Sequence, residues 1–344
     1  MVAKSTAWRE PGVREAGGRG AAGCIALLMV GGSLTFGQTA DKERRYPAPM
    51  AQLPWPFERP PLIVATATPL ADGGERLDEE AVWPMVGFLA EHGADGAFAC
   101  GTTGEGILLS LEERRRAAVV FRAAVRGRLI VHAGAQSTRD TAQLAAHAAE
   151  IGADAVAVIP PPYFPLDDEA LAGHIVAAAA ACAPLPFFIY AFAARSGYPV
   201  SIEVVERVRA EAPNLVGLKV SEAPLDRAAP YLEAGLPVLI GSEPLLPAAL
   251  ARGAVGAVSG LAAAFPDVVR AALDRPDADA EARLTALRTA MEAQPFIASV
   301  KHVLARRGVP MRPDMRAPLR LLTSGEAARL DEALDRLSAA PART

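Results

Sequence analysis

The chain has 344 residues, of which 51% are hydrophobic and 22% charged, so it can form a sizeable core and global disorder is disfavoured. A formal net charge of −4 gives no basic footprint for nucleic acid, which argues against a nucleic-acid-binding protein. The three cysteines are widely spaced and odd in number, so they predict neither a disulfide framework nor a zinc site.

The first segment, residues 1–61, reads as an N-terminal extension that ends in a Pro-rich linker. A basic start, an apolar run at 21–36 and the small residue Ala40 resemble a secretory signal, and the run is too short to predict a membrane span. Acidic residues interrupt the basic start, however, and Gln38 fits the cleavage site poorly. We therefore expect an over-long gene start, with Met50 as the alternative initiator, and a cytoplasmic protein; export is the alternative if the signal is genuine.

From residue 62 onward, short apolar runs alternate with longer helical patterns. The runs are strand-like in length and in β-branched content. They are LIVATAT (62–68), GAFAC (96–100), RLIVHAGA (128–135), AVAVIP (155–160), PFFIYA (186–191), NLVGLKV (214–220), PVLIGS (237–242) and VGAVSG (255–260). Eight such units in about 200 residues predict an α/β protein with a (β/α)8 TIM barrel over residues 62–276.

A doubly wound open sheet is the structural alternative, but it would need a Gly-rich phosphate turn after the first run, and TATPLADGG is not one. After the barrel the pattern is helical only, which predicts a C-terminal helical extension over residues 277–344. One helix start is predicted in detail. Ser110 is placed to cap the helix that follows it, with Glu112 and Glu113 in the first turn, where the helix dipole favours acidic residues.

Polar residues gather at the carboxyl ends of the predicted strands, where TIM barrels carry their active sites. In strand order they are Thr66 and Thr68, Gly101 to Glu105, Tyr163, Tyr190 with Arg195, Lys219, Gly241 to Glu243, and Ser259 with Gly260. No carboxylate pair stands out for glycoside hydrolysis, and no His/Asp/Glu set stands out for metal ligation. We therefore expect no metal and no organic cofactor.

Lys219 gives these strand ends a specific chemistry. The chain has only four lysines, and Lys219 is the one within the predicted barrel, inside an apolar run. A desolvated lysine has a lowered pKa and can attack a ketone to form a protonated imine, which arginine cannot do. A tyrosine hydroxyl can relay the protons, Thr hydroxyls and glycine N–H groups can hold a carboxylate, and an arginine can hold a second anion.

Each of these residues also has a structural interpretation when it is taken alone. Lys219 could extend from a strand end to solvent, Tyr190 could be a core aromatic, and GTTGE could be a plain loop. Their joint placement at successive strand ends favours the chemical interpretation.

Four separate motifs resemble the dihydrodipicolinate synthase/N-acetylneuraminate lyase family of pyruvate-handling class I aldolases. They are GTTGEGILLSLEER, VIPPPYFPLDDEAL, FIYAFAARSG and GLKVSE, and the resemblance covers roughly residues 62–340. It implies that Lys219 is the Schiff-base lysine and Tyr190 the catalytic phenol. It also implies that Thr103 and the partner subunit's Tyr163 complete the proton relay.

The same resemblance implies the binding residues. Thr102, Thr103 and Gly104 match the segment that holds the pyruvate carboxylate, and Arg195 matches an arginine that holds a second carboxylate. Two further positions lie near the pyruvyl group, namely Gly241 and Val258. The resemblance implies a homo-dimer or homo-tetramer whose partner is a small-molecule substrate, pyruvate or a 2-keto acid plus an unknown acceptor, with no nucleic acid and no membrane.

The sequence departs from the family pattern on the acceptor side of the site. Ala191 and Ala193 replace an Asn and a Pro, Val220 replaces an acidic residue, and Ser242 precedes Glu243. We expect a Schiff-base-forming lyase or aldolase, most like 4-hydroxy-tetrahydrodipicolinate synthase, with the second substrate open. A dehydratase or aldolase for sugar-derived 2-keto acids is one alternative, and a non-catalytic metabolite-binding barrel is the other.

Overall fold

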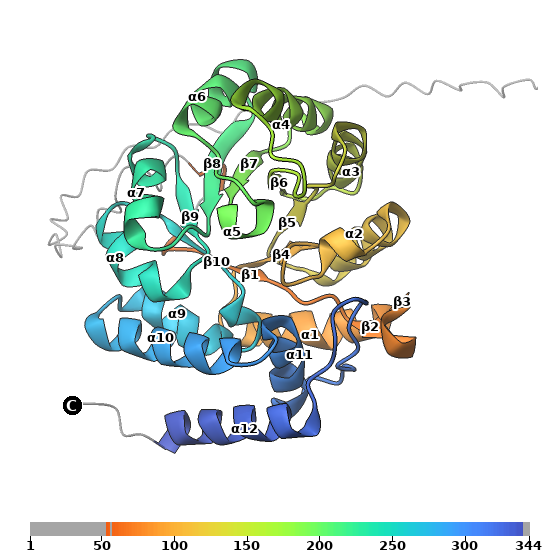
Figure 1. Cartoon of the computed structure of the whole chain (residues 1–344), viewed down its shortest axis with the longest axis vertical. Helices are drawn as coiled ribbons and strands as arrows, with labels where there is room; N and C mark the ends of the chain where they lie inside the picture. Colours follow the sequence, from red (N-terminus) through yellow and green to blue (C-terminus); the bar gives the residue numbers. More distant parts are fainter. Residues whose placement is uncertain (1–52, 56, 340–344) are drawn as a thin grey trace, which may run out of the picture. The chain divides into compact units, whose positions relative to one another are not determined.

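The computed structural model describes residues 53–55 and 57–339, so the predicted signal segment and Met50 lie outside it. Eight parallel strands form a closed barrel in the order β1-β10-β9-β8-β7-β6-β5-β4 (Figure 1). They are β1 (Leu62–Ala65), β4 (Gly96–Ala99), β5 (Arg128–His132), β6 (Ala155–Val158), β7 (Phe187–Ala191), β8 (Leu215–Val220), β9 (Val238–Ile240) and β10 (Gly256–Ser259). Because β1 pairs with both β4 and β10, the sheet has no edge, which confirms the predicted barrel and excludes the open sheet.

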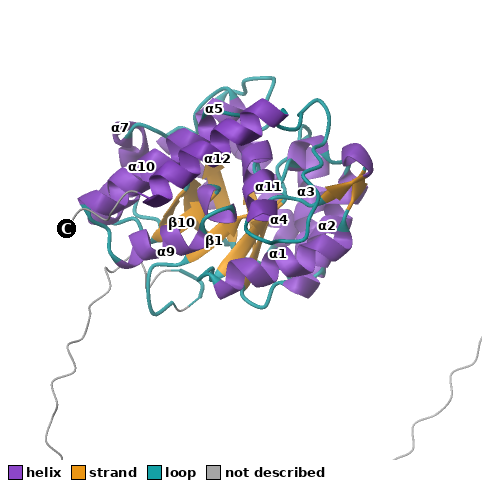
Figure 2. Ribbon diagram, turned by 90° about the horizontal axis from the view of Figure 1, so that it is seen from below, coloured by secondary structure: helices purple, strands orange, loops and turns teal. Residues whose placement is uncertain are grey.

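Helices follow the strands and enclose the barrel, as Figure 2 shows. They are α1 (Glu79–Glu91), α2 (Leu111–Ala124), α3 (Thr138–Glu150), α4 (Asp168–Cys182), α5 (Ala193–Ser196), α6 (Ile202–Glu211), α7 (Leu225–Glu233), α8 (Leu246–Ala251) and α9 (Pro266–Asp274). The predicted cap of α2 is confirmed, since Ser110 Oγ accepts the Glu113 N–H and the Glu113 carboxylate accepts the Ser110 N–H. No helix in the described part of the chain is long and apolar enough to cross a membrane.

The barrel has a packed interior rather than a pore. Aromatic and branched side chains from alternating strand positions fill it, among them Phe98, Ile130, Phe188, Tyr190 and Val258. A second and larger apolar cluster lies between the outer face of the strands and the helices. Both faces of each strand are therefore buried, which is why the strands appear in the sequence as continuous apolar runs.

Residues just before β1 close the barrel at the end opposite to the predicted site. Leu53 and Trp55 are buried with the interior residues, and the Trp55 ring stacks on Phe188 with centroids 6.0 Å apart. The Pro-rich composition of this stretch predicts a linker, but its apolar side chains pack on the barrel, because the open end exposes apolar surface that they can cover.

Three helices follow α9, namely α10 (Ala278–Glu292), α11 (Phe296–Arg306) and α12 (Ser324–Ala339); in Figure 1 α10 lies beside α9, and α12 lies at the bottom, beyond α10. A small antiparallel hairpin of β2 (Leu70–Ala71) and β3 (Arg76–Leu77) lies between β1 and α1. The segment that joins α11 to α12 contacts the turn of this hairpin. There the Arg316 guanidinium donates a hydrogen bond to Gly74 O at 2.6 Å.

Candidate active site

Lys219 lies on β8 directly beside Tyr190 on β7, in register with it. The side chain is buried, with 4% of the residue exposed. Its Nζ lies between two aromatic rings, 3.7 Å from the Tyr190 ring centroid and 3.9 Å from that of Phe98. The lysine therefore ends inside the barrel and does not extend to solvent.

Burial is the main electrostatic influence on this amine. It lowers the pKa of Lys219 from 10.5 to about 7, and the negative charge of Glu243 opposes the change. A substantial part of the amine is therefore neutral near pH 7, which is the form that can act as a nucleophile.

Tyr190 presents its hydroxyl to the loop that follows β4. The Tyr190 Oη lies 3.4 Å from Thr102 Oγ1, and either atom can donate. Burial raises the pKa of Tyr190, and the hydrogen bonds with Thr102 and Ser221 oppose the change. The phenol is therefore protonated at neutral pH and can act as a donor or relay for a proton.

The loop Gly101–Glu105 carries the predicted carboxylate-binding residues. Thr103 and Gly104 are buried and Thr102 is partly buried. The loop is tightly turned, since Gly106 N–H donates to Gly101 O at 3.0 Å, and it is fixed where Thr68 Oγ1 donates to Gly104 O at 2.7 Å. The loop therefore holds Thr102 against the hydroxyl of Tyr190, and Tyr190 in turn lies beside Lys219 on the neighbouring strand.

Gly241 and Val258 lie on the other side of β8 from Tyr190, Gly241 directly after β9 and Val258 on β10. Val258 packs in the barrel interior together with Tyr190. Gly241 follows β9, and a Cβ at this position would overlap Ser221 Oγ. The absence of a side chain at Gly241 therefore keeps space beside the end of β8.

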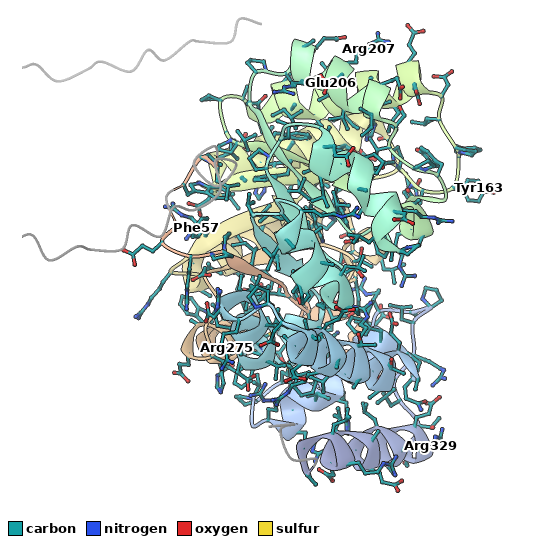
Figure 3. The ribbon with its side chains drawn as sticks, turned by 90° about the vertical axis from the view of Figure 1, so that its left-hand side faces the viewer. Phe57, Tyr163, Glu206, Arg207, Arg275 and Arg329 are labelled. Atoms are coloured by element: carbon teal, nitrogen blue, oxygen red, sulfur yellow. The ribbon has the colours of Figure 1, made fainter. Side chains whose placement is uncertain are left out.

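Two predicted site residues have exposed side chains, away from the barrel interior that holds Lys219. Arg195 is exposed on the short helix α5, with its guanidinium 5.8 Å from the Phe192 ring, which itself lies 6.0 Å from the Tyr190 ring. Tyr163 is 83% exposed in the loop after β6 and contacts Phe164. Figure 3 shows its side chain at the edge of the molecule, away from the barrel and on the side opposite to Phe57.

His132 is a further residue beside Lys219 and Tyr190, and no sequence motif indicated it. It ends β5 with its ring 6.0 Å from those of Tyr190 and Phe98, and Nδ1 donates to Cys100 O at 3.1 Å. Burial, followed by the positive charges of Arg114 and Lys219, lowers the pKa of His132 well below its usual range. The ring is therefore neutral, and its buried Nε2 is an acceptor without a protein partner among the described residues. Its position in the sequence indicates the same orientation. Side chains two residues apart on a strand lie on the same face, and Ile130 packs inside the barrel, so His132 should also point inward.

Glu243 was noticed in the sequence only as a residue that follows β9, but it is the carboxylate that acts on Lys219. It is 1% exposed, and it accepts hydrogen bonds from Ser259 Oγ at 2.7 Å and from the Leu261 N–H at 2.9 Å. Arg288 of α10 donates to its other oxygen at 2.9 Å. These three donors fix the position of the Glu243 carboxylate, whose charge opposes the lowering of the Lys219 pKa.

Within residues 53–55 and 57–339, no three His, Cys, Asp or Glu side chains come together in a group that could hold a metal ion. Cys100 and Cys182 are free and buried, and burial raises the pKa of each thiol to about 11. Neither thiol is therefore suited to act as a thiolate nucleophile. In this part of the chain, the nucleophile favoured by its environment is the Lys219 amine.

The model of the dihydrodipicolinate synthetase family matches residues 60–337 of the chain. An uncharacterized DapA-like lyase of Halobacterium salinarum is 35% identical over 285 residues, which cover 79% of this chain and 90% of that protein. The 4-hydroxy-tetrahydrodipicolinate synthase of Halorhodospira halophila is 34% identical over 287 residues, covering 79% and 95%.

Solved structures give the same result. The N-acetylneuraminate lyase of Proteus mirabilis superposes with a TM-score of 0.73 at 28% identity, covering 80% of this chain and 98% of that one. The resemblance inferred from four motifs is thereby confirmed over the whole barrel and the C-terminal helices. The chain belongs to the dihydrodipicolinate synthetase family, a family of class I pyruvate-dependent lyases and aldolases.

Proposed function

We propose that the chain is a Schiff-base-forming lyase or aldolase that handles pyruvate or a 2-keto acid, most like 4-hydroxy-tetrahydrodipicolinate synthase. The observation that carries the proposal is the buried Lys219 amine, whose pKa is lowered from 10.5 to about 7. At pH 7 about half of such an amine is neutral, whereas roughly one in 3,000 molecules is neutral for an exposed lysine. Burial thus raises the concentration of the nucleophilic form by about three orders of magnitude.

The chemical steps follow from this amine. Lys219 Nζ attacks the ketone carbon of the keto acid, and the resulting carbinolamine loses water to give a protonated imine. The imine withdraws electrons, so a proton can leave the adjacent carbon, and the enamine that forms attacks an acceptor carbonyl. Tyr190 carries protons in these steps, and Thr103 and the partner subunit's Tyr163 complete the relay.

We assign binding of the substrate carboxylate to the hydroxyls of Thr102 and Thr103 and to the backbone N–H of Gly104. Hydroxyl and backbone N–H donors that converge on one point can bind a carboxylate through charge-assisted hydrogen bonds, without a basic side chain. Arg195, which is exposed beyond Phe192, would hold a second carboxylate on the acceptor. Gly241 and Val258 would flank the pyruvyl group.

We propose a homo-dimer or homo-tetramer. Tyr163 and Phe164 are 83% and 70% exposed, form an edge-to-face pair, and offer an apolar surface that a second copy of the chain would cover. Light scattering tests the assembly. A cytoplasmic location stays a prediction, which N-terminal sequencing of the native protein would check.

The test is reduction with borohydride in the presence of pyruvate, followed by measurement of the intact mass. The wild-type chain should acquire one covalent pyruvate-derived adduct, and Lys219→Ala should acquire none. Pyruvate binding without an adduct would instead support the non-catalytic metabolite-binding barrel.

The second candidate, a dehydratase for sugar-derived 2-keto acids, is favoured by one observation. The Nε2 of His132 is a buried acceptor with no protein partner among the described residues, and a hydroxylated substrate would supply the missing donor. A substrate panel separates the synthase from the dehydratase. One set of assays contains pyruvate with aspartate semialdehyde, and the other contains a keto-deoxy sugar acid as the only substrate. Turnover of the first pair supports the synthase, and release of water from the second class supports the dehydratase.

A further inference from the structure

A second lysine, Lys301 of α11, is as deeply buried as Lys219 but takes no part in the proposed chemistry. Its Nζ forms an ion pair with Glu105 Oε1 at 2.6 Å, and both side chains are 0% exposed. It also donates to Asp314 O at 2.5 Å. A buried ion pair contributes little net stability, because removing both charges from water is costly, but separating the two partners would leave an uncompensated buried charge, so they stay together in the folded state.

Glu105 is the last residue of the loop that carries Thr102 and Thr103. Its backbone has a φ of 56°, a left-handed conformation that costs free energy for a residue with a side chain. Its Oε2 accepts the backbone N–H of Arg316 at 2.7 Å, so both carboxylate oxygens contact the C-terminal part of the chain. The loop is therefore held in a strained conformation from outside the barrel.

The segment Asp314–Arg316 is itself tied to the structure around the loop. The Arg316 guanidinium donates to Gly74 O at 2.6 Å and forms an ion pair with Glu113 in the first turn of α2. The Asp314 carboxylate accepts the Gly73 N–H at 3.2 Å. These contacts tie the segment to the hairpin and to α2, so Lys301 and Glu105 connect the loop to a segment that is held at several points.

We propose that Lys301 is a positioning residue, which acts through Glu105 to hold Thr102, Thr103 and Gly104 in the conformation that binds the carboxylate of the keto acid. The inference rests on the proposed function for the identity of the ligand. The C-terminal helical extension thereby determines the affinity of the site, although none of its helices carries a residue of the proposed chemistry.

The test compares Lys301→Met with wild type by borohydride trapping at increasing pyruvate concentration. The concentration that gives half-maximal trapping should rise about tenfold or more, because the loop loses its support. The rate at saturating pyruvate should stay within about threefold of wild type, because the contacts of the Lys219 amine with the rings of Tyr190 and Phe98 do not involve Lys301.

Arg270→Met is the matched control. Arg270 is also a buried cation, with 8% of its side chain exposed, and it pairs with Asp95 and Asp274 away from the loop. Its loss should lower the melting temperature without changing half-saturation by pyruvate. If Lys301→Met is too unstable to purify, the double variant Glu105→Gln/Lys301→Met replaces it, because it leaves no unpaired buried charge. Its melting temperature should recover, while the pyruvate concentration for half-maximal trapping should stay raised.

Hydrogen exchange of the ligand-free protein tests the inference separately from the proposed function. Amides of residues 101–106 should exchange faster than wild type in the Lys301 variants and at the wild-type rate in Arg270→Met. Unchanged exchange together with unchanged half-saturation in a folded Lys301 variant overturns the inference. If wild type forms no adduct, the proposed function fails, and the exchange rates alone decide whether Lys301 positions the loop.

Discussion

Replacing Lys219 with methionine should abolish imine formation and at the same time stabilise the folded protein. Lys219 is 4% exposed, and burial lowers its pKa from 10.5 to about 7, against the opposing effect of Glu243. A tenfold change in a protonation constant corresponds to about 1.4 kcal/mol, so holding the protonated amine costs the folded state about 4–5 kcal/mol. The two rings beside Nζ attract the ammonium and offset part of this cost, so the expected gain is about 2–4 kcal/mol.

The gain has a defined pH dependence. The folded pKa of about 7 lies below the unfolded value of 10.5, so protonation favours the unfolded chain. The cost of Lys219 is therefore complete below pH 7, decreases as the pH rises, and disappears above pH 10.5. Lys219→Met, which does not titrate, should lose its advantage over the same range.

The assay is urea denaturation of wild type and Lys219→Met at several values from about pH 6 to about pH 10, with the slope of the transition checked for constancy. Arg270→Met is the control, because an arginine keeps its charge throughout and its effect should not change with pH. The reasoning is refuted if Lys219→Met is less stable than wild type at about pH 6. A stability difference between them that does not vary with pH would refute it equally.

Further predictions concern activity and assembly. The rate of imine trapping in wild type should fall as the pH decreases through about 7, because Lys219 becomes protonated, and a profile without an inflection there would contradict the assignment. Tyr190→Phe keeps the ring beside Lys219 but removes the hydroxyl, and turnover measured by pyruvate consumption should fall about 10²–10⁴-fold. Arg195→Ala should leave pyruvate trapping unchanged and raise the KM for an acceptor that carries a carboxylate about tenfold or more. A change in pyruvate trapping would instead show that Arg195 acts on pyruvate. Tyr163→Asp should weaken self-association in light scattering, and an unchanged assembly would show that Tyr163 lies outside the interface.

The barrel was predictable because both faces of each strand are buried. Strands such as β6 and β7 therefore read as continuous apolar runs, and their regular alternation with helices allows few topologies. The adjacency of Lys219 and Tyr190 also followed from the sequence, because parallel strands of a barrel end at the same mouth. Local chemistry was readable as well, as in the capping box of Ser110 and Glu113.

Contacts between distant parts of the chain were not predictable. The ion pair of Glu105 and Lys301 depends on how α11 packs against a loop near the start of the barrel, which no local pattern encodes. The role of Glu243 depends on three donors from separate elements, including Arg288 of α10. Tyr163 was assigned to the site only through the family resemblance, and in the single chain it is exposed and away from Lys219, because its proposed role needs a partner subunit.

The most direct measurement is peptide mapping of the chain after borohydride reduction with pyruvate. The mass of the adduct should be found on the peptide that contains Lys219, at the lysine itself. Peptides that contain Lys301 should be unmodified, because that amine is 0% exposed and paired with Glu105. An adduct on any other residue, or no adduct while pyruvate is consumed, would contradict the central claim that Lys219 forms the imine.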